Sequence, residues 1–191
     1  YSVCDSTDCP YIYEMYLNGT LAHKWRFPER LNDLEAVAVD DRNGLILVAE
    51  EEDRRISSFV LPVNSEDWEV IDGEDWLRPV SSFSADQHDG SGQWGLEGLT
   101  VDTTRDYLYA VNQDHPMLFY TFDATGNELS LTYPIFGSSL SGLDYEAATD
   151  RVWVVSSQAQ RYVPLLCRRG RGSADRSGKG LRGRCDLHCG V

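Results

Sequence analysis

The sequence predicts an all-β fold, namely a partial β-propeller with about three blades of four antiparallel strands each. The first observation is an internal repeat, because the segments Leu34–Asp40, Leu96–Asp102 and Leu140–Glu146 read almost alike. The second is that each copy is followed, at a constant offset, by another apolar run. These runs are Leu45–Ala49, Tyr107–Val111 and Val152–Val155. A repeat with a fixed offset favours blades over a sandwich of unrelated strands.

The elements follow the same order in each copy. The polar turns between the first two runs are Asp40–Gly44, Asp102–Asp106 and Glu146–Asp150. The third runs are Arg55–Leu61 and Met117–Asp123, and a fourth strand begins at Glu128 after a glycine turn. All runs are short and rich in β-branched and aromatic residues, as strands are. The N-terminal segment Tyr11–Leu21 resembles Leu118–Leu129, so we expect it to be the outer half of a preceding blade.

The spacing of the copies sets the blade boundaries. Gly98 and Gly142 are 44 residues apart, which fits one blade of about 40–45 residues. Ala36 and Gly98 are 62 residues apart, so this copy carries an insertion between Asn64 and Gln93. The insertion is acidic, and we expect its tryptophans to cap one mouth of the channel, with Trp94 beside them. The other two tryptophans are Trp68 and Trp76. The expected units are a blade fragment over 10–30 and blades over 31–94, 95–136 and 137–166.

The number of blades that a closed ring needs and the charge of the chain limit the classes of protein to which it can belong. Propellers close as rings of four to eight blades, so residues 1–166 predict a fragment, or a domain completed by further blades or a partner. These residues hold 29 acids and 10 bases, a net charge of −19, whereas residues 167–191 carry +5. The acidic body disfavours nucleic acid and anionic lipid and favours cations. The Gly- and Arg-rich tail fits a basic interaction arm, a disordered extension or a shifted reading frame.

Two local signals concern the compartment of the protein, and several absent motifs concern its class. Cys4 and Cys9 bracket four residues and predict a small disulfide-closed loop in an oxidising environment. Asn18-Gly19-Thr20 is a glycosylation sequon, but Asn-Gly is also favourable turn chemistry, and a turn is the interpretation adopted. The sequence has no transmembrane segment, P-loop, dinucleotide fingerprint or Ser-His-Asp arrangement.

The strongest candidates for chemistry are Glu35 and Glu97, which open equivalent strands. The first strand of each propeller blade lines the central channel, so equivalent positions converge on one axis. Carboxylates brought together repel unless a cation intervenes, and calcium takes carboxylate and amide oxygens. The sequence therefore predicts a calcium site with the ligands Glu35, Glu97, Glu50, Asn112 and Asp144. The alternative is that these side chains only bond neighbouring backbone at strand ends.

The run from Glu50 to Arg55 is a second candidate, since four acids are followed by two arginines. Arg54 or Arg55 is suited to bidentate binding of an anionic ligand while the acids hold a metal. The alternative is a solvated hairpin whose charges compensate one another.

Three parts of the chain resemble the SdiA-regulated, YjiK-like propeller family. They are Asp33–Ala38 with Val48–Ile56, then Gly95–Asp102, then Leu140–Tyr145. The likeness covers roughly residues 10–163, although the Glu-Gly-Leu strand also occurs in phytase-like and lactonase-like propellers. It implies a secreted or envelope-associated propeller with a calcium site and no assigned reaction. The recurring family positions fall on Glu35, Glu50, Glu51, Arg54, Glu97 and Ser141. Ala36 stands where Gly is usual, and Ser141 replaces an acid, so the site is not symmetric.

Three functions compete. The first is a calcium-binding module, extracellular or associated with the cell envelope or its membrane, that binds a small molecule or a protein at its channel mouth. Arg54, Glu51 and Ser141 would contact that ligand. The second is a calcium-dependent hydrolase of phosphate or ester bonds, in which the metal polarises the bond and a carboxylate positions water. The third is a structural extracellular module without a small-molecule site. The sequence assigns no catalytic residue.

Overall fold

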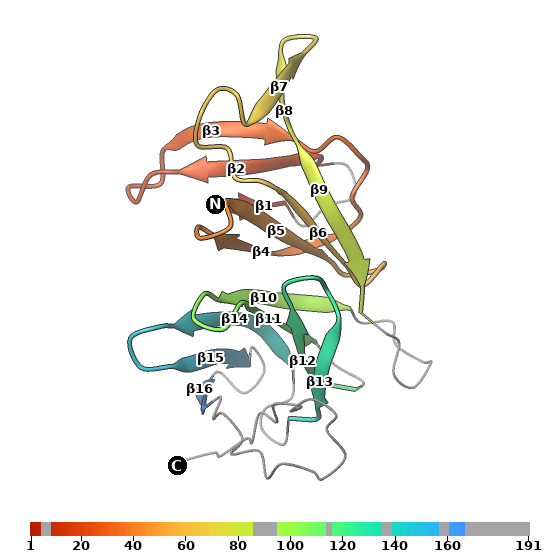
Figure 1. Cartoon of the computed structure of the whole chain (residues 1–191), viewed down its shortest axis with the longest axis vertical. Helices are drawn as coiled ribbons and strands as arrows, with labels where there is room; N and C mark the ends of the chain where they lie inside the picture. The colour runs from red at the N-terminus through yellow and green to blue at the C-terminus, as the bar shows by residue number, and fades with distance from the viewer. Residues whose placement is uncertain (5–8, 86–94, 114–115, 135–138, 157–160, 167–191) are drawn as a thin grey trace, which may run out of the picture.

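The computed structural model describes residues 1–4, 9–85, 95–113, 116–134, 139–156 and 161–166 (Figure 1). Within these residues the strands form four sheets, and Figure 1 shows the sheets stacked along the long axis of the molecule. Neighbouring strands are antiparallel, except where β8 runs parallel to β3. None of the described residues belongs to a helix long and apolar enough to span a bilayer.

The first sheet contains five strands in the order β1-β2-β3-β8-β7. Its strands are β1 (Ser2–Val3), β2 (Tyr11–Met15), β3 (Leu21–Arg26), β7 (Trp68–Ile71) and β8 (Glu74–Leu77). The second sheet has the order β4-β5-β6-β9. Its strands are β4 (Leu34–Asp40), β5 (Leu45–Glu50), β6 (Arg55–Val60) and β9 (Pro79–Ser84). Strands joined by short polar turns pair side by side, whereas β3 pairs with β8 and β6 with β9 across longer stretches of the chain.

The third sheet repeats the order of the second, as β10-β11-β12-β13. Its strands are β10 (Leu96–Asp102), β11 (Tyr107–Asn112), β12 (Leu118–Asp123) and β13 (Glu128–Thr132). The fourth sheet has the order β14-β15-β16. Its strands are β14 (Leu140–Glu146), β15 (Arg151–Ser156) and β16 (Arg161–Leu166). The tail over 167–191, for which three interpretations were open, lies outside the described residues.

The insertion divides between two sheets. The hairpin β7–β8 joins the first sheet, where Trp76 of β8 pairs with Arg26 of β3, while β9 returns to pair with β6. Trp68 packs on Trp25, with ring centroids 6.0 Å apart. The hairpin therefore extends the edge of the first sheet that is farthest from β1, and Trp68 and Trp76 do not cap a channel mouth. Trp94 lies outside the described residues.

The turns between the first and second strands repeat in atomic detail. Gly44, Asp106 and Asp150 occupy the same position in successive copies, and their φ angles are 64°, 56° and 54°. Asp tolerates this left-handed conformation better than most residues. In the second copy Asp102 accepts hydrogen bonds from the backbone and side chain of Arg105. The repeated turns therefore join the first two strands of the second, third and fourth sheets with the same backbone geometry.

Three apolar cores fill the spaces between successive sheets. The core between the first and second sheets contains Ile12, Trp25, Phe27, Leu34, Ile46, Val48 and Phe59. The core between the second and third contains Leu47, Ile56, Leu96, Leu99, Leu108, Tyr120 and Phe122. The core between the third and fourth contains Tyr109, Val111, Phe119, Leu140, Val152 and Val154. Because both faces of the middle sheets are covered, their central strands are buried on both faces: residues 46–50, 56–59 and 108–112 are all buried.

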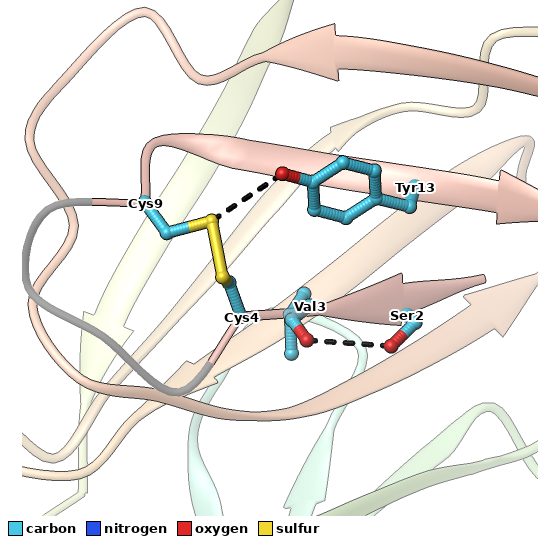
Figure 2. Close-up of a disulfide and its surroundings, with 5 residues drawn as sticks. All are labelled: Ser2, Val3, Cys4, Cys9 and Tyr13. Atoms are coloured by element: carbon cyan, nitrogen blue, oxygen red, sulfur yellow. Dashed lines mark hydrogen bonds between the residues drawn. A yellow bond between two sulfur atoms is a disulfide. The ribbon is translucent and has the colours of Figure 1, made fainter. Parts of the chain in front are cut away.

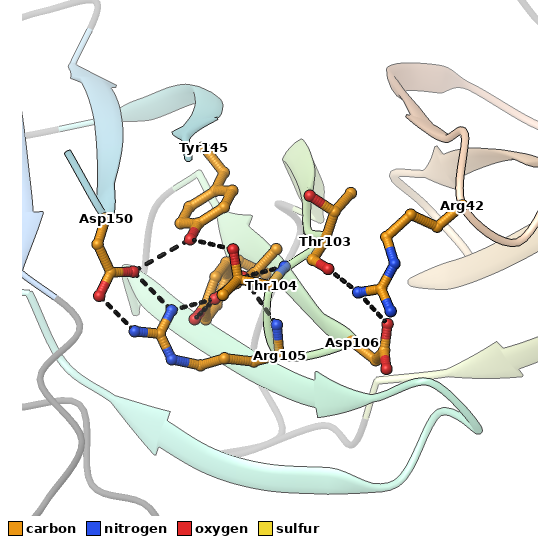
Figure 3. Close-up of polar contacts among 9 residues, drawn as sticks. Arg42, Thr103, Thr104, Arg105, Asp106, Tyr145 and Asp150 are labelled. Atoms are coloured by element: carbon orange, nitrogen blue, oxygen red, sulfur yellow. Dashed lines mark hydrogen bonds and ion pairs between the residues drawn. The ribbon is translucent and has the colours of Figure 1, made fainter. Parts of the chain in front are cut away.

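A polar clamp reinforces the contact between the third and fourth sheets (Figure 3). The guanidinium of Arg105 donates to Asp102 of its own sheet at 2.5 Å and to Oδ1 of Asp150 in the next sheet at 2.6 Å. Tyr145 donates a hydrogen bond to Asp150 at 3.1 Å. Asp102 is fully buried, so its charge needs this arginine. Hydrogen bonds from Arg105 lower the pKa of Asp150, against a smaller opposing effect of burial.

The clamp predicts a pH dependence of stability. A carboxyl with a lowered pKa in the folded state stabilises the fold above its unfolded pKa, and this contribution disappears as the pH falls through the lowered value. Arg105→Ala should therefore melt at a lower temperature than wild type at roughly pH 6, and the gap should narrow at roughly pH 3. Thermal unfolding measured at both pH values checks this. Arg42→Ala is the control, since it removes a more exposed ion pair between sheets, at 3.0 Å from Asp106. An equal pH response in both variants would contradict the clamp.

A disulfide ties the first strand to the second (Figure 2). Cys4 and Cys9 are bonded across a separation of five residues, as the sequence predicted. The sulfur of Cys9 lies 3.5 Å from the hydroxyl of Tyr13. Tyr13 in turn pairs with Ser2 of β1. The bond thus holds the two-residue strand β1 on the edge of the first sheet.

Reduction of this disulfide should loosen β1 without unfolding the molecule. A disulfide that closes a loop this short is expected to add no more than about 2 kcal/mol to the free energy of unfolding. We expect dithiothreitol to lower the melting temperature slightly and to speed amide exchange at Val3, whose partner in the sheet is Ile12. The double variant Cys4→Ser, Cys9→Ser should not respond to the reductant. A global loss of protection on reduction would contradict this.

Candidate metal centre

Each inner strand begins with a β-bulge at the same place. Three register pairs precede the bulges: Leu34 with Glu50, Leu96 with Asn112, and Leu140 with Ser156. In every case the register shifts before the next pair, so one extra residue stands at the bulge. The extra residues are Glu35, Glu97 and Ser141. Bulges redirect side chains and are common beside functional sites, so the three positions singled out by the repeat are structurally equivalent.

Three carboxylates gather at the bulge of the second sheet. Asp33 precedes β4, Glu35 is the bulge residue, and Glu51 follows β5. One carboxylate oxygen from each lies within 4.8 Å of the others, and all three residues are half-buried. They meet because β4 and β5 are antiparallel, which places the start of one strand beside the end of the other.

The backbone fixes this acidic group firmly. The amide of Glu51 donates to the carbonyl of Asp33 at 2.8 Å, and Asp33 adopts a φ of 53°. The amide of Gly95 donates to Oε1 of Glu51 at 3.3 Å. Gly95 approaches so closely that a Cβ there would lie 1.8 Å from the carbonyl oxygen of Glu51. The second and third sheets therefore hold the acidic group between them.

The donor set indicates which ion the acidic group would suit. Three carboxylates this close repel one another unless a cation or proton intervenes. The group contains oxygen donors and no Cys or His, which suits hard cations rather than zinc. Calcium accepts six to eight oxygens in flexible geometry, including backbone carbonyls and water. Asp33, Glu35 and Glu51 would supply the charged part of such a shell.

Glu50 lies beside the acidic group but has different partners. It is fully buried, and its carboxylate accepts from Nε and Nη2 of Arg55 at 2.6 and 3.1 Å. It also accepts from the amide of Asn32 at 3.1 Å. The hydrogen bond to Glu50 raises the pKa of Arg55, against desolvation. Glu50 thus fastens the strand ends around the acidic group, and its role as a direct ligand stays a prediction.

The other predicted ligands lie in separate places. Asn112 is fully buried and donates to the carbonyl of Pro116 at 2.8 Å. Asp144 is exposed and lines a cavity of about 430 Å³ between β4, β10 and β14. Glu97 and Ser141 are half-buried at their bulges. Arg54 is 5% exposed, and its backbone bonds Glu51 and Ala85. None of these residues belongs to the acidic group, and their binding roles stay predictions.

The asymmetry between sheets has a simple origin. In the third sheet the amide of Gln113 donates to the carbonyl of Gly95 at 3.1 Å, which reproduces the bond between Glu51 and Asp33. Gly95 and Gln113 thus stand where the second sheet has Asp33 and Glu51. Two of the three carboxylates are absent from the third sheet at these positions, so it offers only Glu97.

The SdiA-regulated family profile matches residues 2–174 of the chain. The chain belongs to the SdiA-regulated family. This confirms the resemblance seen in the repeated segments, including the acid-Arg-Arg-Ile run that encloses Glu51. A search of curated proteins gives no match.

Solved structures place this SdiA-regulated chain in the propeller fold. It is similar to a functionally unknown protein from Desulfotomaculum acetoxidans, with a TM-score of 0.52 and 9% identity over 83% of this chain and 44% of that one. It is also similar to the Cps50 (Swd1) β-propeller domain of Myceliophteria thermophila, with a TM-score of 0.54 and 13% identity over 80% and 46%. The all-β, propeller prediction is confirmed. The chain spans less than half the length of these two solved chains.

Proposed function

We propose that this protein is a calcium-binding propeller module that presents a metal site at one end of its inner strands to a ligand or protein. The observation that carries the proposal is the acidic group of Asp33, Glu35 and Glu51, whose oxygens lie within 4.8 Å of one another. Its carboxylates favour a hard divalent cation. The net charge of −14 adds a general attraction for cations.

The position of the acidic group supports a role in binding. The cavity between the inner strands begins at Val37, two residues after Glu35 in the same strand, and extends past Asp144. Asp33, Glu35 and Glu51 do not line this cavity themselves, so a ligand that touches both would have to reach from the cavity past Val37 to a cation at the acidic group. Half-burial of the three carboxylates leaves room for such an external donor.

The disulfide supports an extracellular or envelope setting. Disulfides form and persist in oxidising compartments and are rare in the cytosol, and Cys4 is bonded to Cys9. Extracellular calcium sites bind with dissociation constants of about 0.1–1 mM. If the site of three carboxylates has a dissociation constant in this range, extracellular calcium would fill it without the need for very high affinity.

Calorimetric titration of the whole chain with calcium tests the proposal. We expect one saturable site and a rise in melting temperature that grows with calcium concentration, because a ligand that binds only the folded state stabilises it. Magnesium should bind more weakly, since it keeps its waters and demands octahedral geometry. If calcium produces neither a heat of binding nor a change in melting temperature, the proposal is wrong and the protein is a structural module.

A panel of phosphate and ester substrates, assayed with added calcium, separates a binding module from a hydrolase. A hydrolase would need the bound metal to polarise the substrate and a nearby carboxylate to position water. Turnover that depends on calcium and disappears in Glu51→Gln would replace the binding proposal with the hydrolase.

A further inference from the structure

The hairpin between β2 and β3 ends in an exposed apolar tip. Met15, Tyr16 and Leu21 are 47%, 64% and 56% exposed, and Leu17 is fully exposed. Figure 1 shows this hairpin projecting at one side of the first sheet. Four large exposed apolar side chains within seven residues of one hairpin differ from the singly scattered exposed residues of ordinary surfaces. Such clusters commonly mark a surface that something else covers.

The same tip contains the sequon Asn18-Gly19-Thr20 in an ordered turn. The amide of Gly19 donates to the carbonyl of Tyr16 at 2.8 Å, and Gly19 has a φ of 85°. The side-chain oxygen of Asn18 accepts from the amide of Thr20 at 3.0 Å and from its hydroxyl at 2.8 Å. These bonds engage the oxygen of the Asn18 amide and not its nitrogen, which is the atom that an oligosaccharide would join. Asn18 and Thr20 are both exposed.

This sequon is unique in the chain. Of the six asparagines, only Asn18 is followed at the second position by Ser or Thr. The hairpin of the third sheet, between β12 and β13, makes the same pair of bonds, because the amide and hydroxyl of Thr125 donate to Oδ1 of Asp123 at 2.9 and 2.7 Å. The acceptor there is Asp, so this turn does not require Asn at the position of Asn18. The disulfide between Cys4 and Cys9 is an independent sign of a secretory compartment, where asparagine glycosylation takes place.

We propose that Asn18 is an N-glycosylation site and that its glycan covers the apolar tip of the β2–β3 hairpin. The donor is a lipid-linked oligosaccharyl pyrophosphate. The bond between the sugar C1 and the pyrophosphate oxygen breaks, a bond from C1 to Nδ2 of Asn18 forms, and the amide loses one proton while lipid pyrophosphate leaves. The inference shares only its extracellular setting with the proposed calcium function, because the hairpin belongs to a different sheet from the acidic group.

The test exports the full chain through the secretory pathway of a eukaryotic host and measures its intact mass before and after treatment with peptide-N-glycosidase. Wild type should lose a glycan mass in the treatment. Asn18→Gln and Thr20→Ala should show no loss, whereas Thr20→Ser should behave as wild type because serine also completes the sequon. Retention of the glycan in Asn18→Gln would overturn the assignment.

A gained sequon provides the positive control. Glu66→Thr creates a second sequon that begins at Asn64, in a loop where residues 64–66 are all exposed. If this variant is glycosylated at Asn64 while Asn18 stays bare, the proposal fails. Tryptic peptides from the protein's native source decide the matter independently, because the peptide that contains Asn18 ends at Lys24 and has no other asparagine within residues 1–24. An unmodified Asn18 in that peptide would also overturn the proposal.

The cover provided by the glycan has its own readout. The glycosylated protein should bind less of a fluorescent hydrophobic dye than the same protein after enzymatic deglycosylation. Leu17→Ser should lower dye binding of the deglycosylated form, since it removes the most exposed apolar side chain of the tip. Equal dye binding with and without the glycan would refute the shielding role. The glycosylated and deglycosylated forms should bind calcium with the same affinity. If the glycan proposal fails, calcium binding is unchanged, and if the metal proposal fails, glycosylation is unchanged, so the two failures can be told apart.

Discussion

Glu51→Gln is expected to weaken calcium binding by at least about tenfold, because the charge on the ligands sets the affinity of calcium sites. The substitution keeps the size of the side chain and the oxygen that accepts from the amide of Gly95. It removes one of the three negative charges that meet within 4.8 Å. Without calcium, the variant should be as stable as wild type or slightly more so, since repulsion among carboxylates falls. Calorimetry and thermal unfolding with and without calcium measure both effects.

Glu52→Gln is the matched control for this prediction. Glu52 stands next to Glu51, is exposed, and is not a member of the acidic group. It therefore changes the net charge of the chain equally while leaving the proposed shell intact. Comparable losses of affinity in the two variants would mean that calcium responds to overall charge and not to this group. Asp33→Asn is a further check, because Asn tolerates the φ of 53° found at this position.

Gly95→Ala should cause the largest loss of stability, on the order of 3 kcal/mol. The new Cβ would lie 1.8 Å from the carbonyl oxygen of Glu51 and 2.7 Å from its Cα. Both are backbone atoms, so the strand ends of two sheets must separate. For a chain of this size, such a loss lowers the melting temperature by roughly 6–12 °C. Calcium binding should also fall, because the same movement displaces Glu51. Differential scanning calorimetry and titration check the two outcomes together.

Gly142→Ala separates this steric effect from the general cost of losing glycine. A Cβ at Gly142 would meet only the side chain of Val155, at 3.7 Å, which is an ordinary contact. The alanine also restricts the unfolded chain, which favours the folded state slightly. We expect stability near that of wild type and unchanged calcium binding. A large destabilisation at Gly142 would show that the inner strands resist any added side chain, and the explanation for Gly95 would then be wrong.

The repeat in the sequence was sufficient for the architecture but incomplete for the site. It located the bulge residue Glu35 and, through its constant offset, the residue Glu50. The register shows why the offset led there: Glu50 pairs with Leu34 across the two strands. The carboxylate that lies beside Glu35 belongs to Glu51, one residue further, which the sequence predicted as a ligand contact, while the metal role of Glu50 stays a prediction. A pattern of spacings identifies paired backbone positions, whereas the acidic group depends on how the chain turns after the strand.

Asp33 was not selected because it precedes the strand and looks like an ordinary turn residue. Its contribution depends on a left-handed φ and on a backbone bond to Glu51, neither of which a single sequence displays. The hairpin β7–β8 was misplaced for a related reason. Its partner β3 lies about fifty residues earlier in the chain, since Arg26 pairs with Trp76, and such long-range pairing leaves no local signal. The sequence therefore predicted the features that repeat from sheet to sheet, but not the contacts that occur in one sheet alone.

The route of the chain through the insertion has a consequence for how the molecule comes apart. After β6 the chain leaves the second sheet, builds β7 and β8 onto the first, and returns as β9. The backbone therefore crosses between the first two sheets more than once, whereas within the described strands the third and fourth sheets simply follow one another in the chain. In repeat proteins, cooperativity between neighbours depends on their interfaces. Here the repeated crossing of the backbone between the first and second sheets adds to that coupling. These two sheets should therefore unfold as a single unit, while the third and fourth sheets unfold one after another.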